Sequence, residues 1–328
     1  MILVLSNEAY EQGTDPVLSW LLHYRVPFVK VSLHDLVTSK VRYHVDLKTR
    51  DIIINGQSVK DSITTIWHRR FLGAANAMVF SAGGNTDQLN FEIRTELHDL
   101  VGYLELLFRH KTWLTAFQGI KVNKLAVMDL ASQSGLRVPH TRVINNRAEA
   151  LAFYHELHGQ LISKPIADVR GSYQQGDSTY VVLTKALDAP DITGLPEYFF
   201  PSLFQEKVAV DFEIRVFYLA GRFFATGMLF SGAERNVDKK LDSTSEQIHY
   251  VPYQLPAAVE QQLTQLMHTL ELNTGCIDLL RTQEGEYVFI EVNPVGQYLA
   301  ESTYCNYTLE KEIAEWLINQ EMLCASSE

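Results

Sequence analysis

Three oxygen-bearing side chains, Asp278, Glu291 and Asn293, stand inside two apolar runs near the C-terminus. The runs read GCIDLL and YVFIEVNP and are separated by RTQEGE. Short apolar runs on either side of a turn segment predict the two strands of a buried hairpin. Carboxylate and amide oxygens are the ligands that Mg2+ prefers, often together with substrate phosphates. The pattern therefore predicts a magnesium site and a phosphate-bearing substrate.

The register of this hairpin decides whether the three side chains meet. If Glu284 and Gly285 form a two-residue turn, Asp278 lies directly opposite Glu291, and Asn293 shares their face because side chains alternate along a strand. The residues expected on the core-facing side are Ile277, Leu279, Ile290 and Val292. Because Glu-Gly is not the favoured Asn-Gly turn, a three-residue loop with a bulge stays open. Two facing carboxylates repel unless a cation lies between them. The alternative, a half-exposed hairpin with its acids in water, fits the apolar run around Glu291 less well.

Cations that could meet a phosphate stand earlier in the chain. Lys124 opens a predicted helix, a position where lysine opposes the helix dipole. Lys164 stands in the apolar strand QLISKPI, where a lone lysine is rarely buried without a partner. Arg215 alternates with Asp211 and Glu213 in the strand DFEIRVF. Each of these residues alone is also explained as a solvated charge, so their order along the chain carries the argument.

Two further segments could contact a nucleotide. The loop ADVRGSYQQGDS, residues 167 to 178, contains Gly171 and Gly176, and its backbone N–H groups could cover phosphates. A plain hairpin turn explains this loop as well, and the pattern GxxxxGK[ST] is absent. An extended run that could pair its backbone with an adenine edge consists of Gln205, Glu206, Lys207 and Val208. Asp211 or Glu213 would then be within reach of a ribose hydroxyl.

Strands and helices alternate over residues 1 to 110, which predicts a small α/β layer that ends in a long helix from Asn90 to His110. Within it, IWHRRF places Arg69 and Arg70 just past a strand, a position suited to an anion or a partner, with an ordinary solvated strand end equally compatible. The rest of the chain mixes both element types, and its last helix is expected to end near Asn319. We predict the α/β (α+β) class with units at residues 1–112, 113–200 and 201–328.

Composition limits the partners. Lys plus Arg number 28 and Asp plus Glu 39, so the net charge of −11 argues against general affinity for nucleic acid or an anionic membrane. No run approaches the about 18 apolar residues that span a bilayer. The cysteines, Cys276, Cys305 and Cys324, are odd in number and form no CxxC, which favours free thiols and a cytoplasmic location.

Taken in order, these features resemble the ATP-grasp superfamily over about residues 115 to 318. The most specific part is IDLL followed by FIEVNPVGQY. Three segments, IWHRRF, NKLAVMDLASQSGLRVP and HYVPYQLP, are similar to the maturases of graspetides (microviridin-type peptides), and most of all to the grasp-with-spasm group. That group usually shows Tyr or Trp followed by two arginines, whereas here His68 stands between Trp67 and the arginine pair.

The resemblance implies an N-terminal pre-ATP-grasp domain, a central subdomain with the glycine-rich loop, and a C-terminal subdomain with the ATP and Mg2+ site. The implied nucleotide-binding residues are Lys124, Lys164, Gly171, Gln205, Glu206, Lys207, Val208, Asp211 and Glu213. The implied metal ligands are Asp278, Glu291 and Asn293. The implied catalytic residues are Arg215, near the transferred phosphate, and Arg235 and Asn236, beside the acceptor.

The activity implied by the resemblance is ATP-dependent activation of an Asp or Glu side chain of a ribosomally made precursor peptide as an acyl-phosphate. A Ser or Thr hydroxyl or a Lys amine of the same peptide then forms a macrocyclic ester or amide. The implied partners are the precursor peptide, with leader and core, and a second copy of the chain in a homodimer. In the polar segment 232–250, Asp238, Lys239 and Lys240 are candidate peptide contacts, with an ordinary solvated loop equally compatible.

Two alternatives stay open at this point. One is another ATP-grasp carboxylate-amine ligase with an amino acid or small-molecule acceptor. The other is a non-catalytic nucleotide-sensing or peptide-binding module, against which a complete set of metal ligands argues. Nucleophilic catalysis by a Ser-His-Asp or Cys-His arrangement has no support, since no GxSxG occurs.

Overall fold

The computed structural model describes residues 1–38, 40–71, 86–115, 122–167, 172–175, 178–181, 183–230 and 248–325. Gly171, Gly176, Arg235, Asn236 and the segment with Asp238, Lys239 and Lys240 lie outside these ranges. Within them, no helix is long and apolar enough to cross a bilayer.

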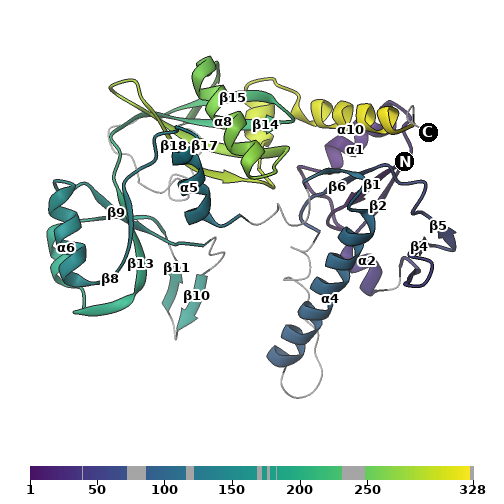
Figure 1. Cartoon of the computed structure of the whole chain (residues 1–328), viewed down its shortest axis with the longest axis horizontal. Helices are drawn as coiled ribbons and strands as arrows, with labels where there is room; N and C mark the ends of the chain where they lie inside the picture. Colours follow the sequence, from purple (N-terminus) through teal and green to yellow (C-terminus); the bar gives the residue numbers. More distant parts are fainter. Residues whose placement is uncertain are drawn as a thin grey trace.

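The N-terminal part is built on a four-stranded parallel sheet in the order β2-β1-β6-β7. Its elements are β1 (Ile2–Leu5), α1 (Asp15–His23), β2 (Phe28–Val31), α2 (Leu33–Val37), β6 (Thr65–His68), α4 (Thr86–Phe108) and β7 (Thr112–Leu114). A small antiparallel sheet, β3 (Tyr43–Asp46), β4 (Asp51–Ile54) and β5 (Gln57–Ser58), lies beside it. Helix α4 projects away from the rest of the chain (Figure 1). The alternation of strands and helices in the sequence predicted this layer.

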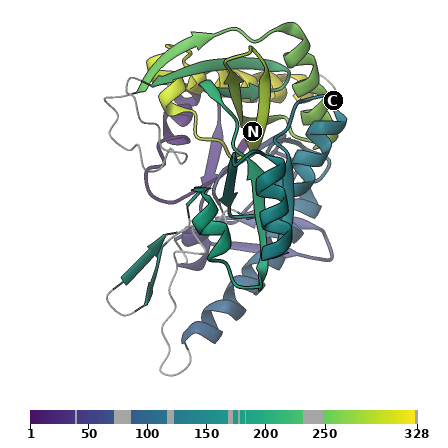
Figure 2. The ribbon, with the colours of Figure 1, turned by 90° about the vertical axis from the view of Figure 1, so that its left-hand side faces the viewer.

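A second, antiparallel sheet has the order β12-β9-β13-β8. Its elements are β8 (Thr141–Asn146), α6 (Arg147–Glu156), β9 (Leu161–Lys164), β12 (Lys185–Leu187), α7 (Ala189–Thr193) and β13 (Tyr198–Glu206). The hairpin β10 (Ser172–Gln175) and β11 (Ser178–Val181) extends from it, so part of the segment expected as loop is strand. Figures 1 and 2 both show this hairpin and α4 pointing to the same side of the molecule. The predicted boundary after residue 200 falls inside β13.

The third sheet, with order β16-β15-β14-β17-β18, is antiparallel throughout. Its strands are β14 (Val210–Leu219), β15 (Arg222–Phe230), β16 (Ile248–Tyr253), β17 (Thr274–Thr282) and β18 (Tyr287–Asn293). The helices around it are α5 (Lys124–Gln133), α8 (Ala257–Thr269), α9 (Leu299–Tyr304) and α10 (Leu309–Ala325). Helix α10 continues past Asn319, where we expected its end, because QEMLCA contains no Gly or Pro to stop it.

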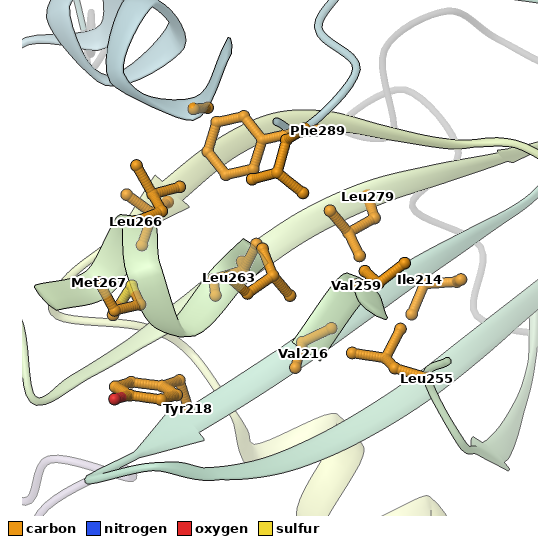
Figure 3. Close-up of a cluster of buried hydrophobic side chains, with 14 of the residues drawn as sticks. Ile214, Val216, Tyr218, Leu255, Val259, Leu263, Leu266, Met267, Leu279 and Phe289 are labelled. Carbon is orange, nitrogen blue, oxygen red and sulfur yellow. The ribbon is translucent and has the colours of Figure 1, made fainter. Parts of the chain in front are cut away.

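The two faces of this sheet have different neighbours. One face carries Ile214, Val216 and Leu279, which pack with residues of α8 into an apolar core (Figure 3). On the other face, Phe217 and Leu219 join a core shared with α1, α10 and the N-terminal sheet. Because side chains alternate along β14, the residues before Phe217 on this second face, Glu213 and Arg215, lie beyond the apolar part.

The hairpin of β17 and β18 has the predicted pairing at the site, and its turn is the three-residue loop with a bulge that the sequence left open. Asp278 lies opposite Glu291, as expected from a two-residue turn. The turn itself is longer, because the N–H of Thr282 donates to the carbonyl of Glu286 at 3.0 Å, and Gly285 adopts φ +95°. A bulge between Asp278 and Leu279 compensates for the additional turn residue. Ile290, which we expected in the core, is only half-buried, because the bulge breaks the alternation there and Phe289 is buried instead.

Candidate active site on the β14-β17-β18 surface

A row of charged side chains crosses three strands of the third sheet. Arg215 on β14 pairs with Asp278 on β17, and Asp278 pairs with Glu291 on β18. The sheet register alone therefore brings one cation and two acids side by side, and the acids are held about one strand spacing apart.

Arg215 holds one end of this row. Its Nη1 lies 3.3 Å from Asp278 Oδ1, its Nη2 donates to the Gln297 carbonyl at 3.2 Å, and its Nε lies 3.4 Å from Glu301 Oε1. Burial opposes the charge of Arg215, yet Asp278 and Glu301 raise the pKa of the guanidinium above its ordinary value. The side chain stays charged and is aimed by three acceptors.

Lys124 holds the other end. It is the first residue of α5, whose N-cap residue Asn123 accepts hydrogen bonds from the N–H groups of Leu125 and Ala126 at 3.0 and 3.2 Å. Its Nζ donates to Glu291 Oε2 at 2.8 Å. The N-cap fixes the start of the helix, so Lys124 is directed at the carboxylate of β18.

Lys164 approaches from the second sheet. It closes β9, opposite Leu203 of β13. Burial lowers the pKa of its ammonium group, Glu291 opposes this shift, and Lys124 adds to it. Two lysines, one from the start of helix α5 and one from strand β9, therefore share the electrostatic field of one carboxylate, an arrangement suited to an anion between them.

The donor set suits a hard cation. Asp278, Glu291 and Asn293 offer only oxygen, and Asn293 Oδ1 already accepts from the N–H of Gly296 at 3.1 Å, which orients the amide. Among the described residues no three His, Cys, Asp or Glu side chains gather as a metal cluster, so an all-protein cage is not present there. Two carboxylates and an amide beside two lysines fit Mg2+ whose remaining ligands are phosphate oxygens.

No family model matches the chain, and no curated protein matches it. The solved macrocyclase MdnC from Microcystis aeruginosa MRC, bound with precursor peptide MdnA, superposes with a TM-score of 0.78 at 21% identity over 97% of this chain and 99% of that one. The RiPP-associated ATP-grasp ligase of Chryseobacterium gregarium, in complex with ADP and a leader and core peptide, gives 0.81 at 20% identity over 97% and 96%. The chain has the ATP-grasp fold. This confirms the predicted fold class.

A more distant structure with this fold is the VanG D-Ala:D-Ser ligase of Enterococcus faecalis, with a TM-score of 0.53 at 11% identity over 97% of this chain and 98% of that one. The ATP-grasp likeness thus extends over nearly the whole chain, and its N-terminal sheet belongs to the shared architecture.

Residues 205 to 208, the run predicted to contact adenine, lie at the end of β13 beside this site. Gln205 is 2% exposed, and its side chain donates to Thr141 Oγ1 at 2.7 Å, so that side chain is structural. The Glu206 carboxylate accepts from Arg137 at 3.2 Å. Both side chains are therefore occupied within the ATP-grasp framework, and any nucleotide contact of this run would come from its backbone.

The backbone of the run is partly used as well. The N–H of Glu206 donates to the His140 carbonyl at 2.8 Å, and that of Lys207 to the Gln160 carbonyl at 3.0 Å. In the described part of the chain no hydrogen bond engages the N–H of Val208. Val208 is thus the residue of the run whose N–H is open to an acceptor on a base.

Of the two acids predicted near the ribose, Asp211 is exposed and Glu213 is 7% exposed. Glu213 lies two residues before Arg215 on the face that carries the charged row. Sequence reasoning missed Glu301 and Arg137. Glu301 sits 3% exposed in α9, and its only sequence signal is a lone acid in the apolar run YLAES.

Proposed function

We propose that the chain is an ATP-dependent ligase that activates Asp or Glu side chains of a ribosomally made precursor peptide and joins them to Ser, Thr or Lys side chains, forming macrocycles. The observation that carries this proposal is the pair of facing carboxylates, Asp278 and Glu291, bracketed by Arg215 and Lys124 on an ATP-grasp sheet. Such a row sets phosphate-binding cations beside metal-binding carboxylates, the combination that a polyphosphate and its metal require.

In this proposal Lys124 and Lys164 bind the phosphates of ATP, and Asp278, Glu291 and Asn293 hold Mg2+. When bound, Mg2+ would neutralise charge on the phosphate oxygens. The segment from Gln205 through Lys207 to Val208 would border the adenine, Glu213 or Asp211 the ribose, and Gly171 the phosphates. Arg235 and Asn236 stay proposed acceptor-side residues.

In this proposal Arg215 acts in the transfer itself. A carboxylate oxygen of the peptide attacks the γ-phosphorus of ATP, ADP leaves, and an acyl-phosphate forms on the peptide. A hydroxyl or amine of the peptide then attacks the acyl carbon, phosphate leaves, and the proton of the nucleophile is released. Both steps need positioning and charge stabilisation more than they need a protein nucleophile. Arg215 and the two lysines would supply that positioning and charge.

Support for a peptide as the substrate comes from the comparisons. MdnC was solved with precursor peptide MdnA, the Chryseobacterium ligase with ADP and a leader and core peptide, and PsnB with a variant of its minimal precursor, Mg and ADP. PsnB matches with a TM-score of 0.73 at 16% identity over 98% of both chains. The TM-score for the D-Ala:D-Ser ligase is lower, which favours a peptide over a small-molecule acceptor.

The test is the intact mass of a leader-bearing peptide rich in Ser, Thr, Asp and Glu, encoded beside the gene, after incubation with enzyme, ATP and Mg2+. We expect loss of one water mass for each ring, abolished in Asp278→Asn and Glu291→Gln. Glu284→Gln, which removes an exposed acid from the same hairpin, is the matched control and keeps the activity.

The alternative is an ATP-grasp carboxylate-amine ligase with a small acceptor, and the leader distinguishes the two. Slower modification of a leaderless core peptide supports the macrocyclase. ATP turnover that needs Mg2+ but is indifferent to every peptide tested, without any mass loss, contradicts the macrocyclase and favours the alternative.

The remaining proposals concern the state of the protein. We propose a homodimer, since Phe91 and Leu106 expose apolar side chains on the projecting helix α4, and light scattering of the purified chain tests it. A cytoplasmic location is supported by the free, buried thiols of Cys276 and Cys305, and fractionation of the producing cells tests it.

A further inference from the structure

Arg69, just past β6 in the N-terminal sheet, reaches the loop that follows the proposed metal ligand Asn293. Its Nη1 donates to the Gly296 carbonyl at 2.8 Å and also to the Val295 carbonyl. Its guanidinium lies 5.3 Å from the ring centre of Tyr298. The basic segment that the sequence suggested for an anion or a partner thus makes, through Arg69, a contact inside the chain.

The guanidinium is fixed on its other side by an acid. Arg69 is 4% exposed, and its Nε lies 3.1 Å from Glu11 Oε2, which also accepts from the Thr14 hydroxyl at 2.7 Å. Burial alone would raise the pKa of the Glu11 carboxyl, but Arg69 and Thr14 bring it below its ordinary value. A buried, charge-paired guanidinium with a fixed acid partner has little freedom to move, so the carbonyls it binds are held as well.

The loop it holds is short and directly tied to the site. Gly296 donates its N–H to Asn293 Oδ1 at 3.1 Å, and the next carbonyl, that of Gln297, accepts from Arg215 at 3.2 Å. The backbone of Gly296 has φ +53°, and a Cβ there would lie 2.8 Å from Cys276 Sγ. The loop therefore fits tightly between Arg69 on one side and the charged row on the other.

A second contact closes the same connection. The Tyr298 hydroxyl donates to the Gly13 carbonyl at 2.5 Å, and the Tyr298 side chain is 1% exposed. Gly13 lies against Arg69, since a Cβ on Gly13 would be 2.2 Å from Arg69 Nη2. The segment before α1, the end of β6 and the loop after β18 are thus packed around one guanidinium.

We propose that Arg69 is a positioning residue for the metal site: it holds the 294–298 loop and, through it, the amide of Asn293 in the orientation that accepts Mg2+. The inference rests on the proposed function, because it requires nucleotide and Mg2+ at the Asp278–Asn293 site. The N-terminal sheet thereby takes part in nucleotide binding although its own residues do not contact the nucleotide. Outer contacts that orient a metal ligand commonly change metal affinity about 10- to 100-fold when they are removed.

The experiment compares Arg69→Met with Arg70→Met. Arg70 pairs with the same Glu11 at 3.4 Å, whereas the hydrogen bonds to the Val295 and Gly296 carbonyls come from Arg69, so the Arg70 variant controls for the charge lost beside Glu11. Binding of ADP is measured by calorimetry with Mg2+ and with EDTA. We expect Arg69→Met to weaken ADP binding about tenfold or more with Mg2+ and to leave binding in EDTA unchanged, with Arg70→Met like wild type in both.

A second variant moves Arg69 without removing its charge. Gly13→Ala places a methyl group against the guanidinium and should give the same Mg2+-dependent loss, while thermal unfolding reports whether each variant is folded. If wild type binds ADP with Mg2+ and both folded variants bind it equally well, the positioning role is refuted and the proposed function stands. If wild type itself shows no Mg2+-dependent ADP binding, both are refuted.

Discussion

Replacement of Arg215 by Met tests the charged row most directly. The side chain is 20% exposed and has ion pairs with Asp278 and with the buried Glu301. Met has similar length and no charge, so the two acids lose their shared counter-charge while the volume is kept. Removing one partner of a buried ion pair costs about 3–5 kcal/mol, and the residual exposure of Arg215 places the expected loss at the lower end, about 3 kcal/mol.

Arg215→Met should lower turnover by more than its loss of stability accounts for. Loss of one charged donor at a site of developing charge lowers turnover about 100- to 1000-fold. Urea unfolding measures the first effect, and the peptide mass assay, in conditions where the variant is folded, measures the second. Arg215→Lys keeps the charge but cannot reach three acceptors, so it should recover most of the stability and little of the turnover.

The pH dependence gives an internal check on the reasoning. The ion pairs that Arg215→Met removes require charged acids, so its stability deficit should shrink once the carboxylates of the protein are neutralised at low pH. A deficit that is independent of pH, or a variant with wild-type stability and turnover, would refute the assignment of Arg215 as the counter-charge of these acids.

Three other predictions follow from single side chains. The pKa of Lys164 is lowered from 10.5 by burial, so the unfolded state binds more protons at alkaline pH. Lys164→Met should therefore be more stable than wild type at neutral pH, and its advantage in urea unfolding should fall as pH approaches 10.5. Burial lowers the pKa of His68 from 6.5 to about 4, so wild type should lose about 3 kcal/mol of stability as pH falls across that window, and a His68→Phe variant with the same pH slope would contradict this. Arg137→Met releases the Glu206 carboxylate beside the proposed adenine site and should raise KM for ATP with kcat unchanged in steady-state kinetics; a change confined to kcat would oppose it.

The facing acids of the charged row and the helix start at Lys124 could be predicted from the sequence because they depend on local rules. Alternation along two strands put Asp278 and Glu291 opposite each other, and the N-cap residue Asn123 placed Lys124 at a helix start. The turn was less predictable, because Glu284-Gly285 is compatible with more than one loop length. The bulge before Leu279 offset that error, so the pairing at the site was correct although the residues nearer the turn were shifted by one.

Contacts between distant segments could not be predicted in this way. Arg69 and Gly296 are 227 positions apart, and Lys124 and Glu291 are 167 apart. Strand periodicity shows that a side chain lies on one face of a sheet, but not which other element meets that face. For this reason the sequence left IWHRRF open between a surface for an anion or a partner and a solvated strand end, whereas Arg69 is buried against the chain's own backbone.

The position of the charged row on the third sheet explains how the N-terminal sheet contributes to the site. On one face of β14, Phe217 and Leu219 are buried against α1 and α10, and the same face continues into Arg215 and Glu213. The apolar part of this face packs the third sheet against the N-terminal elements. Arg69 and Tyr298 hold the 294–298 loop in place. Phosphoryl transfer depends mainly on preorganised charges, which lose effect when they move by a fraction of an ångström. The apolar interface directly beside the charged row therefore helps to hold the row in place. Loss of the packing between the N-terminal sheet and the third sheet should weaken Mg2+-dependent nucleotide binding before the second sheet unfolds.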